Sequence, residues 1–201
     1  PVDFRSVAPG HWDWEKLPRV GTPAARPGNP DSVVADWSVA PDDWGYFLTR
    51  VWDEWFKRDY GRVFVDQFEN VISQMFGHGA QKCVSGRICG KALAIEYNGD
   101  LYSCDHFVYP EYKLGNIREV HEGDLVFSEL QKKFAYAKSE TLPQYCKSCA
   151  YLELCWGECP KNRFVKTPDG EKGLNYLCPG LKKFYAKATS ERLELTKRLA
   201  L

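Results

Sequence analysis

The chain has 201 residues, 44% of them hydrophobic, which is enough for one large domain or two small ones with a true core. Lysine plus arginine and aspartate plus glutamate number 27 each, so no basic excess favours nucleic acid as a partner. No apolar stretch approaches the roughly 18 residues that a membrane-spanning helix needs. There is no secretory signal at the start, and because the chain opens on Pro1 we expect it to be an excerpt of a longer protein.

Residues 1–40 are predicted to be irregular, because prolines and glycines interrupt them throughout. Their tryptophans, Trp12, Trp14 and Trp37, indicate that this segment lies against a larger body. From Pro41, a favourable first helical residue, apolar residues recur at steps of three and four and predict an amphipathic helix that ends near Gly61. Its predicted buried face consists of Trp44, Phe47, Leu48, Val51, Trp52, Trp55 and Phe56.

Residues 63–65 are a strand candidate, and a further short helix is expected over 66–76. This order of helix, strand and helix is typical of the last unit of a β/α repeat. Residues 92–97 and 100–104 predict two strands of a β-hairpin, because Asn-Gly between two strand-like runs is a strong hairpin signal. The hairpin brings Cys104 close to Cys89, since its strands run antiparallel.

The remainder of the chain is predicted to be helical at two places. Residues 124–139 form one helix, with Leu130, Phe134 and Ala137 on one face, and residues 180–201 form a charged terminal helix. Between them, residues 146–160 leave little room for regular structure because four cysteines occupy them.

The cysteine pattern is the most specific feature of the sequence. The cysteines are Cys83, Cys89, Cys104, Cys146, Cys149, Cys155, Cys159 and Cys178. The spacing is C-x9-G-x4-C, then C-x2-C-x5-C-x3-C, then one downstream cysteine. Four disulfides are the alternative, but the C-x2-C and C-x3-C pairs aim both thiolates at one point, and a chain of this length does not need disulfides to fold. Two four-thiolate metal sites in a reducing, cytoplasmic compartment therefore explain the pattern better.

This pattern resembles the SPASM domain, the auxiliary-cluster domain at the C-terminus of many radical S-adenosylmethionine enzymes. The sequence is closest to anaerobic sulfatase-maturating enzymes over roughly residues 35–200. The matching segments are Gly90–Glu96, Asn98–Val108, Tyr112–Ile117 and Cys159–Arg163. The resemblance implies an α+β fold, in which residues 1–80 are the end of a partial β/α barrel with an irregular N-terminal segment. Residues 81–201 would be the SPASM domain, with a hairpin, two cluster-binding loops and a C-terminal helix.

The resemblance also implies an activity and its cofactors. The enzymes carry three [4Fe–4S] clusters, of which one cleaves S-adenosylmethionine and two auxiliary clusters lie in the SPASM domain. The radical formed abstracts a hydrogen from a cysteine or serine of a sulfatase, which is then oxidised to formylglycine. A sulfatase polypeptide and an electron-transfer protein of the flavodoxin or ferredoxin type are the implied partners.

The ligand sets are also implied by the resemblance. Proximity along the chain alone would group the four cysteines of 146–159. The family pattern is crossed instead. It assigns the first cluster to Cys83, Cys89, Cys104 and Cys159, and the second to Cys146, Cys149, Cys155 and Cys178.

Four side chains beside the cysteines have two interpretations each. Asp105 is either a polar loop residue or, by the resemblance, the general base that deprotonates the substrate thiol or hydroxyl. His106 either orders the site or packs, and packing is favoured. Lys161 and Arg163 either offset the negative charge of a cluster or are solvated.

The chain departs from the family in one respect. It lacks the C-x3-C-x2-C loop that holds the S-adenosylmethionine-cleaving cluster, so by itself it cannot start the radical reaction, and no S-adenosylmethionine-binding residue is assigned. Three alternatives stay open: another SPASM enzyme that modifies peptides, a double-zinc module for protein binding, and a stand-alone electron carrier. Iron and acid-labile sulfide in the purified chain would indicate a SPASM enzyme, whereas two zinc ions would indicate the double-zinc module.

Overall fold

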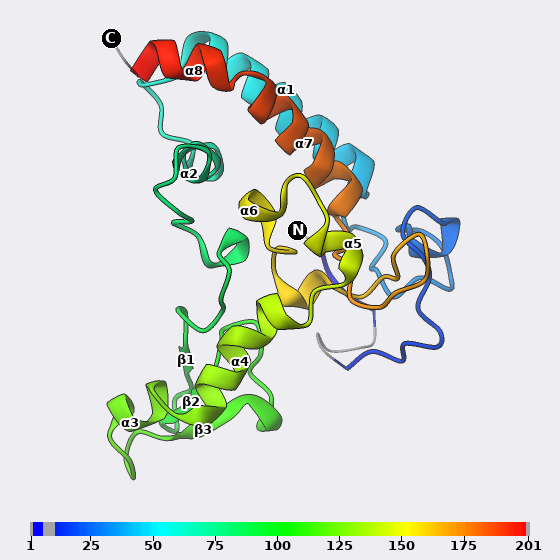
Figure 1. Ribbon diagram of the computed structural model, residues 1–201. Coiled ribbons are helices and arrows are strands. Elements are labelled where there is room, and N and C mark those ends of the chain that lie inside the picture. The colour runs from blue at the N-terminus through cyan, green and yellow to red at the C-terminus, as the bar shows by residue number, and fades with distance from the viewer. Residues whose placement is uncertain (1, 6–10, 200–201) are drawn as a thin grey trace.

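The computed structural model describes residues 2–5 and 11–199, in which helices accompany one small sheet (Figure 1). The elements are α1 Pro41–Arg58, α2 Asp66–Met75, β1 Ala94–Ile95, β2 Asp100–Tyr102, β3 Lys113–Asn116, α3 Glu122–Val126, α4 Glu129–Glu140, α5 Gln144–Lys147, α6 Leu152–Cys155, α7 Cys178–Ser190 and α8 Arg192–Leu199, with the 3-10 turns η1 Pro23–Ala25, η2 Cys83–Ser85, η3 Pro110–Tyr112 and η4 Pro160–Asn162. The expected mixture of helices and a small sheet is thus confirmed. None of the described helices is long and apolar enough to cross a bilayer.

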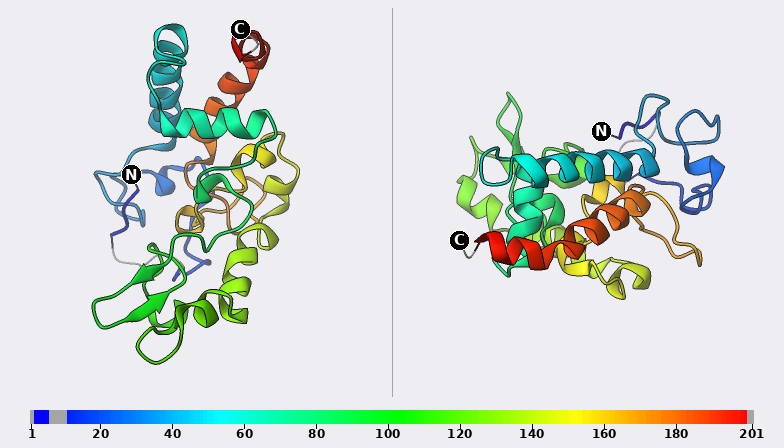
Figure 2. Two further views of the ribbon diagram at one scale, coloured as in Figure 1. Left: turned by 90° about the vertical axis from the view of Figure 1, so that its left-hand side faces the viewer. Right: turned by 90° about the horizontal axis from the view of Figure 1, so that it is seen from above.

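Helices α1 and α7 pack side by side along one end of the molecule (Figures 1 and 2). Helix α1 begins at Pro41 as predicted, with acidic residues in its first turn and basic residues in its last, where each sign complements the helix dipole. Its buried side carries Leu48, Trp52 and Trp55. Phe47 and Val51 were predicted on this face but are exposed, because the buried stripe is narrower than the run of apolar residues.

Two glycines set the approach of α1 to α7. A Cβ atom placed on Gly45 would lie 2.6 Å from the Cα atom of Gly180, so neither position has room for a side chain. Replacing Gly45 by alanine would ordinarily stabilise a helix interior by about 1 kcal/mol. Here we expect Gly45→Ala to lower the free energy of unfolding by about 1–3 kcal/mol, since overpacking forces the two helices apart. Urea denaturation measures this free energy, and a variant more stable than the parent would contradict the close packing of the two helices.

The strand predicted over residues 63–65 does not form. The N–H groups of Arg62 and Val63 both bond to the Asp59 carbonyl, which closes a turn after α1, and the Trp55 indole donates to the Val63 carbonyl at 2.7 Å. Phe64 is 71% exposed. The backbone groups that a strand would offer to a neighbour are therefore used locally, and the described residues contain no β/α barrel. Helix α2 follows as expected.

The sheet has three antiparallel strands in the order β1-β2-β3. The hairpin is present, but its loop is longer than the predicted two-residue turn: Glu96 N–H donates to the Asp100 carbonyl, which leaves three residues in the loop. Gly99 takes a left-handed φ of +92° there, which glycine adopts without steric cost. Strand β3 was not predicted. It is held by Asn116 and Lys113, which both reach the Asp100 carboxylate.

Each of the two predicted later helices is interrupted. The helix expected over 124–139 is divided into α3 and α4, because the Ser128 hydroxyl accepts the Gln131 N–H and caps a new helix. The terminal helix starts earlier than expected, at Cys178, and is interrupted at Glu191 between α7 and α8. Within 146–160, where little structure was expected, the single turns α5 and α6 form.

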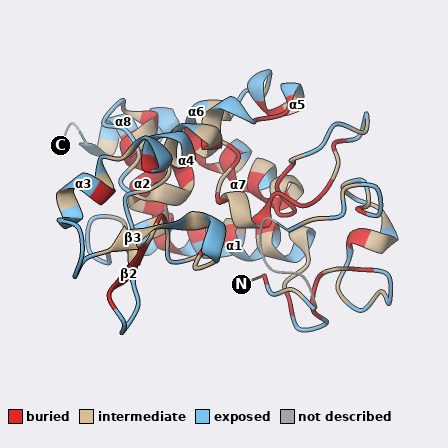
Figure 3. Ribbon diagram, turned by 90° about the horizontal axis from the view of Figure 1, so that it is seen from below, coloured by how far each residue is buried: buried red, intermediate tan, exposed pale blue. Residues whose placement is uncertain are grey.

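The hydrophobic core lies under α1, α2 and α7 and continues into the irregular segments (Figure 3). Trp52 is fully buried and packs against Phe68 and Phe184. The described part of the N-terminal segment lies on this body as expected, since Trp12 contacts Phe164. Trp37, in contrast, is 77% exposed.

Candidate metal centres

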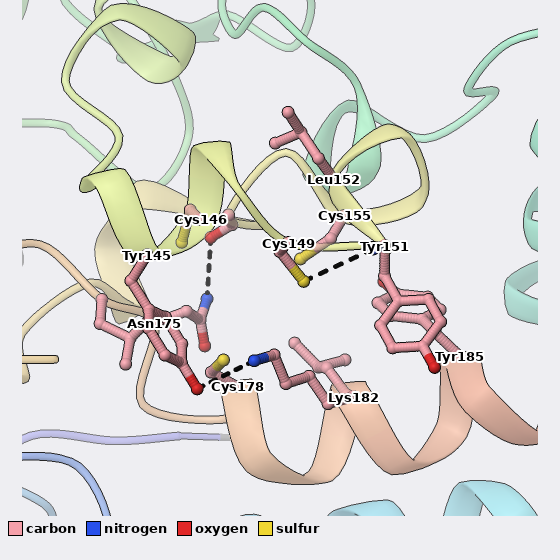
Figure 4. Close-up of a pocket in the computed structure, with 13 residues that line it drawn as sticks. Tyr145, Cys146, Cys149, Tyr151, Leu152, Cys155, Asn175, Cys178, Lys182 and Tyr185 are labelled. Carbon is pink, nitrogen blue, oxygen red and sulfur yellow. Dashed lines mark hydrogen bonds between the residues drawn. The ribbon is translucent and has the colours of Figure 1, made fainter. Parts of the chain in front are cut away.

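The eight cysteines line two separate cavities. The first is lined by Cys83, Cys89, Cys104 and Cys159, and the second by Cys146, Cys149, Cys155 and Cys178 (Figure 4). All eight are free thiols. These are the two sets of the crossed pattern, and the grouping by chain proximity is not observed, because Cys155 and Cys159 face different cavities although only three residues separate them.

The first cavity is assembled from segments far apart in the sequence. Cys83 begins the turn η2, Cys104 follows β2, and Cys159 precedes η4. The backbone N–H of Cys89 donates to the Ala135 carbonyl on α4 at 3.1 Å. From the same helix, the buried Lys138 donates to the Cys83 and Val84 carbonyls at 2.5 and 2.7 Å. The Gln131 amide of α4 also donates to the Ser103 carbonyl at 3.3 Å, so this helix ties the upstream cysteine loop to the end of the hairpin.

The second cavity lies between the turns α5 and α6 and the start of α7 (Figure 4). Cys178 is the first residue of α7, whose positive N-terminal end favours an anionic group. Lys182, one turn later, donates to the Tyr145 hydroxyl at 2.9 Å. Among the described residues the buried Tyr185 hydroxyl has no hydrogen-bond partner, and the Cys155 sulfur is one of its polar neighbours. An orphaned donor facing sulfur is what a bound anionic iron–sulfur group would satisfy.

Burial favours the protonated form of thiols in both cavities of the metal-free chain. It raises the pKa of Cys104, Cys159 and Cys178 to about 12, and it raises the pKa of Cys155 further. A metal is bound by the thiolate, so binding here displaces protons.

We expect the metal-free chain to lose stability above about pH 8.5. In the unfolded chain the thiols ionise near this pH, whereas in the folded chain the pKa of Cys178 is about 12. Between the two values the unfolded state binds fewer protons, so the free energy of unfolding falls as the pH rises; below pH 8.5 this contribution is complete. Thermal denaturation of the metal-free chain at about pH 7 and about pH 10.5 measures it. The stability of Cys178→Ser should fall less between these two pH values than that of the parent chain. An equal or steeper fall in this variant would contradict the raised pKa of Cys178.

The separation of the thiols does not suit a single metal ion. Four thiolates around one zinc ion at 2.3 Å lie about 3.8 Å from one another. Among the described residues, which include all eight cysteines, no three thiols lie within 4.8 Å of one another. A polynuclear iron–sulfur group binds its four thiolates through different irons, so its thiolates can lie farther apart than those around one zinc ion. Each cavity therefore fits such a group better than zinc.

Asp105 and His106 stand at the edge of the first cavity. The Asp105 carboxylate accepts from the Cys104 thiol at 3.2 Å and is 60% exposed. The His106 ring lines the cavity, with Nδ1 at 3.6 Å from the Cys159 sulfur, so it contacts the thiols instead of packing elsewhere. Burial lowers the pKa of His106, and Lys161 adds to this effect.

Comparisons with known proteins point to an iron–sulfur cluster-binding domain. Residues 83–150 match the SPASM family, an iron-sulfur cluster-binding domain. The match contains five of the eight cysteines, Cys83, Cys89, Cys104, Cys146 and Cys149, and the other three follow it in the sequence.

Anaerobic sulfatase-maturating enzymes are among the proteins to which this chain is similar. The chain is 46% identical over 155 residues to a serine-type enzyme of Bacteroides thetaiotaomicron and 32% identical over 181 residues to a cysteine-type enzyme of Clostridium novyi. It covers 37% and 48% of their lengths, and these matches take up 77% and 89% of the chain. Native anSMEcpe, solved with AdoMet and the Cp18Cys peptide, has a TM-score of 0.71 at 25% identity, over 81% of this chain and 45% of that one.

Several residues at the two cavities were not identified from the sequence. Lys138 and Tyr185 lie on helices whose patterns give no sign of a site, and Lys182 is one of several lysines along α7. Arg163 was considered, but its burial was not predicted: the residue is 6% exposed. No sequence signal would have distinguished these side chains from ordinary helix or loop residues.

Proposed function

We propose that this chain binds two [4Fe–4S] clusters and forms the auxiliary-cluster part of a radical S-adenosylmethionine enzyme that oxidises a cysteine or serine of a sulfatase to formylglycine. The observation that carries the proposal is the division of eight thiols into two quartets, and among the described residues no three of these sulfurs lie within 4.8 Å of one another. The similarity to serine-type and cysteine-type sulfatase-maturating enzymes supports the substrate class.

Each quartet would hold one cluster. Cys83, Cys89, Cys104 and Cys159 would bind the first, and Cys146, Cys149, Cys155 and Cys178 the second. When bound, the clusters would supply acceptors for the electron that the substrate loses on oxidation. The chain's own contribution is to bury the thiolates, tie distant segments together, and keep Asp105 exposed beside the first site.

Asp105 is proposed as the general base. Its carboxylate is the solvent-facing acid directly beside Cys104, so a substrate side chain can approach it from outside. Removing a proton where an electron also leaves avoids a build-up of charge on the substrate. In the metal-free chain the carboxylate accepts from the Cys104 thiol; with that sulfur engaged as a thiolate ligand, the carboxylate is free for the substrate.

The remaining parts of the proposal concern organisation and partners. Residues 1–80 would form the end of the radical-enzyme barrel, and residues 81–201 the SPASM unit. An electron-transfer protein of the flavodoxin or ferredoxin type would exchange electrons with the clusters. The S-adenosylmethionine and the third cluster would be bound by protein outside this chain, whose eight cysteines are all assigned.

Conversion of a substrate peptide tests this function. The complete enzyme that contains this chain would be incubated anaerobically with S-adenosylmethionine, a reductant and sulfatase-derived peptides that carry either cysteine or serine. Formylglycine, detected by mass spectrometry and by labelling of the aldehyde, is the expected product. Cleavage of S-adenosylmethionine with no modification of either peptide would exclude the sulfatase substrate and favour another SPASM peptide-modifying enzyme.

A further inference from the structure

The link between the two cavities has an unusual backbone conformation. Trp156, Gly157 and Glu158 connect Cys155, in the second cavity, to Cys159, in the first. Their φ angles are 47°, 68° and 53°. Residues other than glycine visit this left-handed region singly and at a cost, and two of these three are not glycine. Such a run persists only where the surrounding structure holds it.

One side chain holds all three residues of this link. The Arg163 guanidinium donates to the carbonyls of Trp156, Gly157 and Glu158 at 2.5, 3.0 and 3.3 Å. Its remaining nitrogen donates to the Lys138 carbonyl on α4 at 2.7 Å. The planar fork of arginine can satisfy several acceptors in fixed directions, which the single ammonium of lysine cannot do. Arg163 thus fastens the link to the helix beside the first cavity.

The space around the link is closed as well. A Cβ atom on Gly157 would lie 2.5 Å from a Leu142 methyl group and 2.6 Å from the Arg163 guanidinium. The Asn175 amide also donates to the Gly157 carbonyl, at 3.3 Å. The conformation of the link is therefore fixed from several sides, and with it the opposite directions of Cys155 and Cys159.

The charge of Arg163 points to anionic groups on both sides. The residue is 6% exposed, and no carboxylate among the described residues forms an ion pair with it. A buried cation without a counter-ion is costly. Thiols of both cavities act on its charge, and these are Cys146, Cys155, Cys89 and Cys159. Two clusters held by four thiolates each would supply the missing negative charge from either side.

We propose that Arg163 is the positioning residue shared by the two cluster sites. It holds residues 156–158 in the left-handed conformation, so that Cys155 and Cys159 serve different clusters, and it places one positive charge between them. This inference rests on the proposed cluster binding. Its consequence is specific: the loss of one side chain, itself no ligand, should disturb both sites, whereas the loss of a ligand cysteine disturbs one.

Arg163→Lys tests the inference, since it keeps the charge and removes the fork. The variant would be made in two backgrounds, Cys104→Ala, which leaves the second site, and Cys178→Ala, which leaves the first. Iron and sulfide per chain and the reduction midpoint of the remaining cluster would be measured anaerobically. We expect the iron content to fall at least twofold, from about four, in both backgrounds. Lys138→Met is the matched control: among the described residues the Lys138 ammonium binds only the Cys83 and Val84 carbonyls, so the variant should affect the first site alone.

The possible outcomes separate the two proposals. Parent chains without iron and sulfide would refute the cluster binding itself. Loaded parents whose Arg163→Lys variants keep about four irons and an unchanged midpoint in either background would overturn the role of Arg163. If Arg163→Lys does not fold, Glu158→Gly is added, because glycine adopts the left-handed conformation without steric cost. Restored iron binding would support the role, and no restoration would overturn it.

Discussion

Cys159→Ala is expected to remove one cluster and leave the other, so that the iron content falls from about eight to about four per chain. The reason is that Cys159 faces the cavity of Cys83, Cys89 and Cys104, and the thiols of the second cavity are complete without it. A four-thiolate site that loses one ligand keeps only three, and burial favours the protonated forms of two of them, Cys89 and Cys104, by raising their pKa, so the site binds its cluster poorly.

Two double variants decide which cluster is lost. Adding Cys104→Ala to Cys159→Ala removes a second ligand from the same site, so about four irons should remain. Adding Cys149→Ala instead breaks the other site and should leave almost none. If the four cysteines of 146–159 formed one site, the two results would be exchanged. That exchange would contradict the crossed assignment, whatever the total iron content of the parent.

Asp105→Asn is expected to abolish product formation while leaving S-adenosylmethionine cleavage intact. The amide is isosteric with the carboxylate but cannot take a proton, and general base catalysis contributes about 100-fold to 10,000-fold in rate. We therefore expect formylglycine formation in the complete enzyme to fall at least 100-fold. Single-turnover assays that follow 5′-deoxyadenosine and formylglycine together provide the measurement.

Two controls accompany this variant. Its iron and sulfide content should equal that of the parent, because Asp105 is 60% exposed and is not a cysteine of either cavity. Asp124→Asn makes the same chemical change at an exposed position on α3 and should leave the rate unchanged. Formation of formylglycine by Asp105→Asn at the parent rate would remove Asp105 from the mechanism.

Local signals in the sequence predicted local structure well. Pro41 with its acidic neighbours predicted the start of α1, and Asn98-Gly99 predicted the hairpin. Errors arose where a hydrogen bond within a turn or a helix cap decides the outcome. Residues 63–65 have the composition of a strand but turn back onto the end of α1. The predicted helix 124–139 is divided because the Ser128 hydroxyl caps a second helix in its middle.

The cysteines that line the two cavities were predictable from the sequence, but their surroundings were not. Cysteine spacing identified the thiols, since few other residues bind soft metals in such a pattern. The cations were not predictable, because a lysine on an amphipathic helix and an arginine after a cysteine are usually solvated. Only the fold brings Lys138 and Arg163 under the cysteine loops, where backbone carbonyls satisfy their donors. The orphaned hydroxyl of Tyr185 could be identified only from its surroundings in the structure.

Metal and acid-labile sulfide analysis of the anaerobically purified chain, combined with Mössbauer spectroscopy, tests the central claim most directly. Two [4Fe–4S] clusters predict about eight irons and about eight sulfides per chain, with the spectrum of cubane clusters. Two zinc ions and no sulfide, from cells supplied with iron, would contradict the claim. The two cavities would then be zinc sites that contract on binding, and the chain would be a protein-binding module.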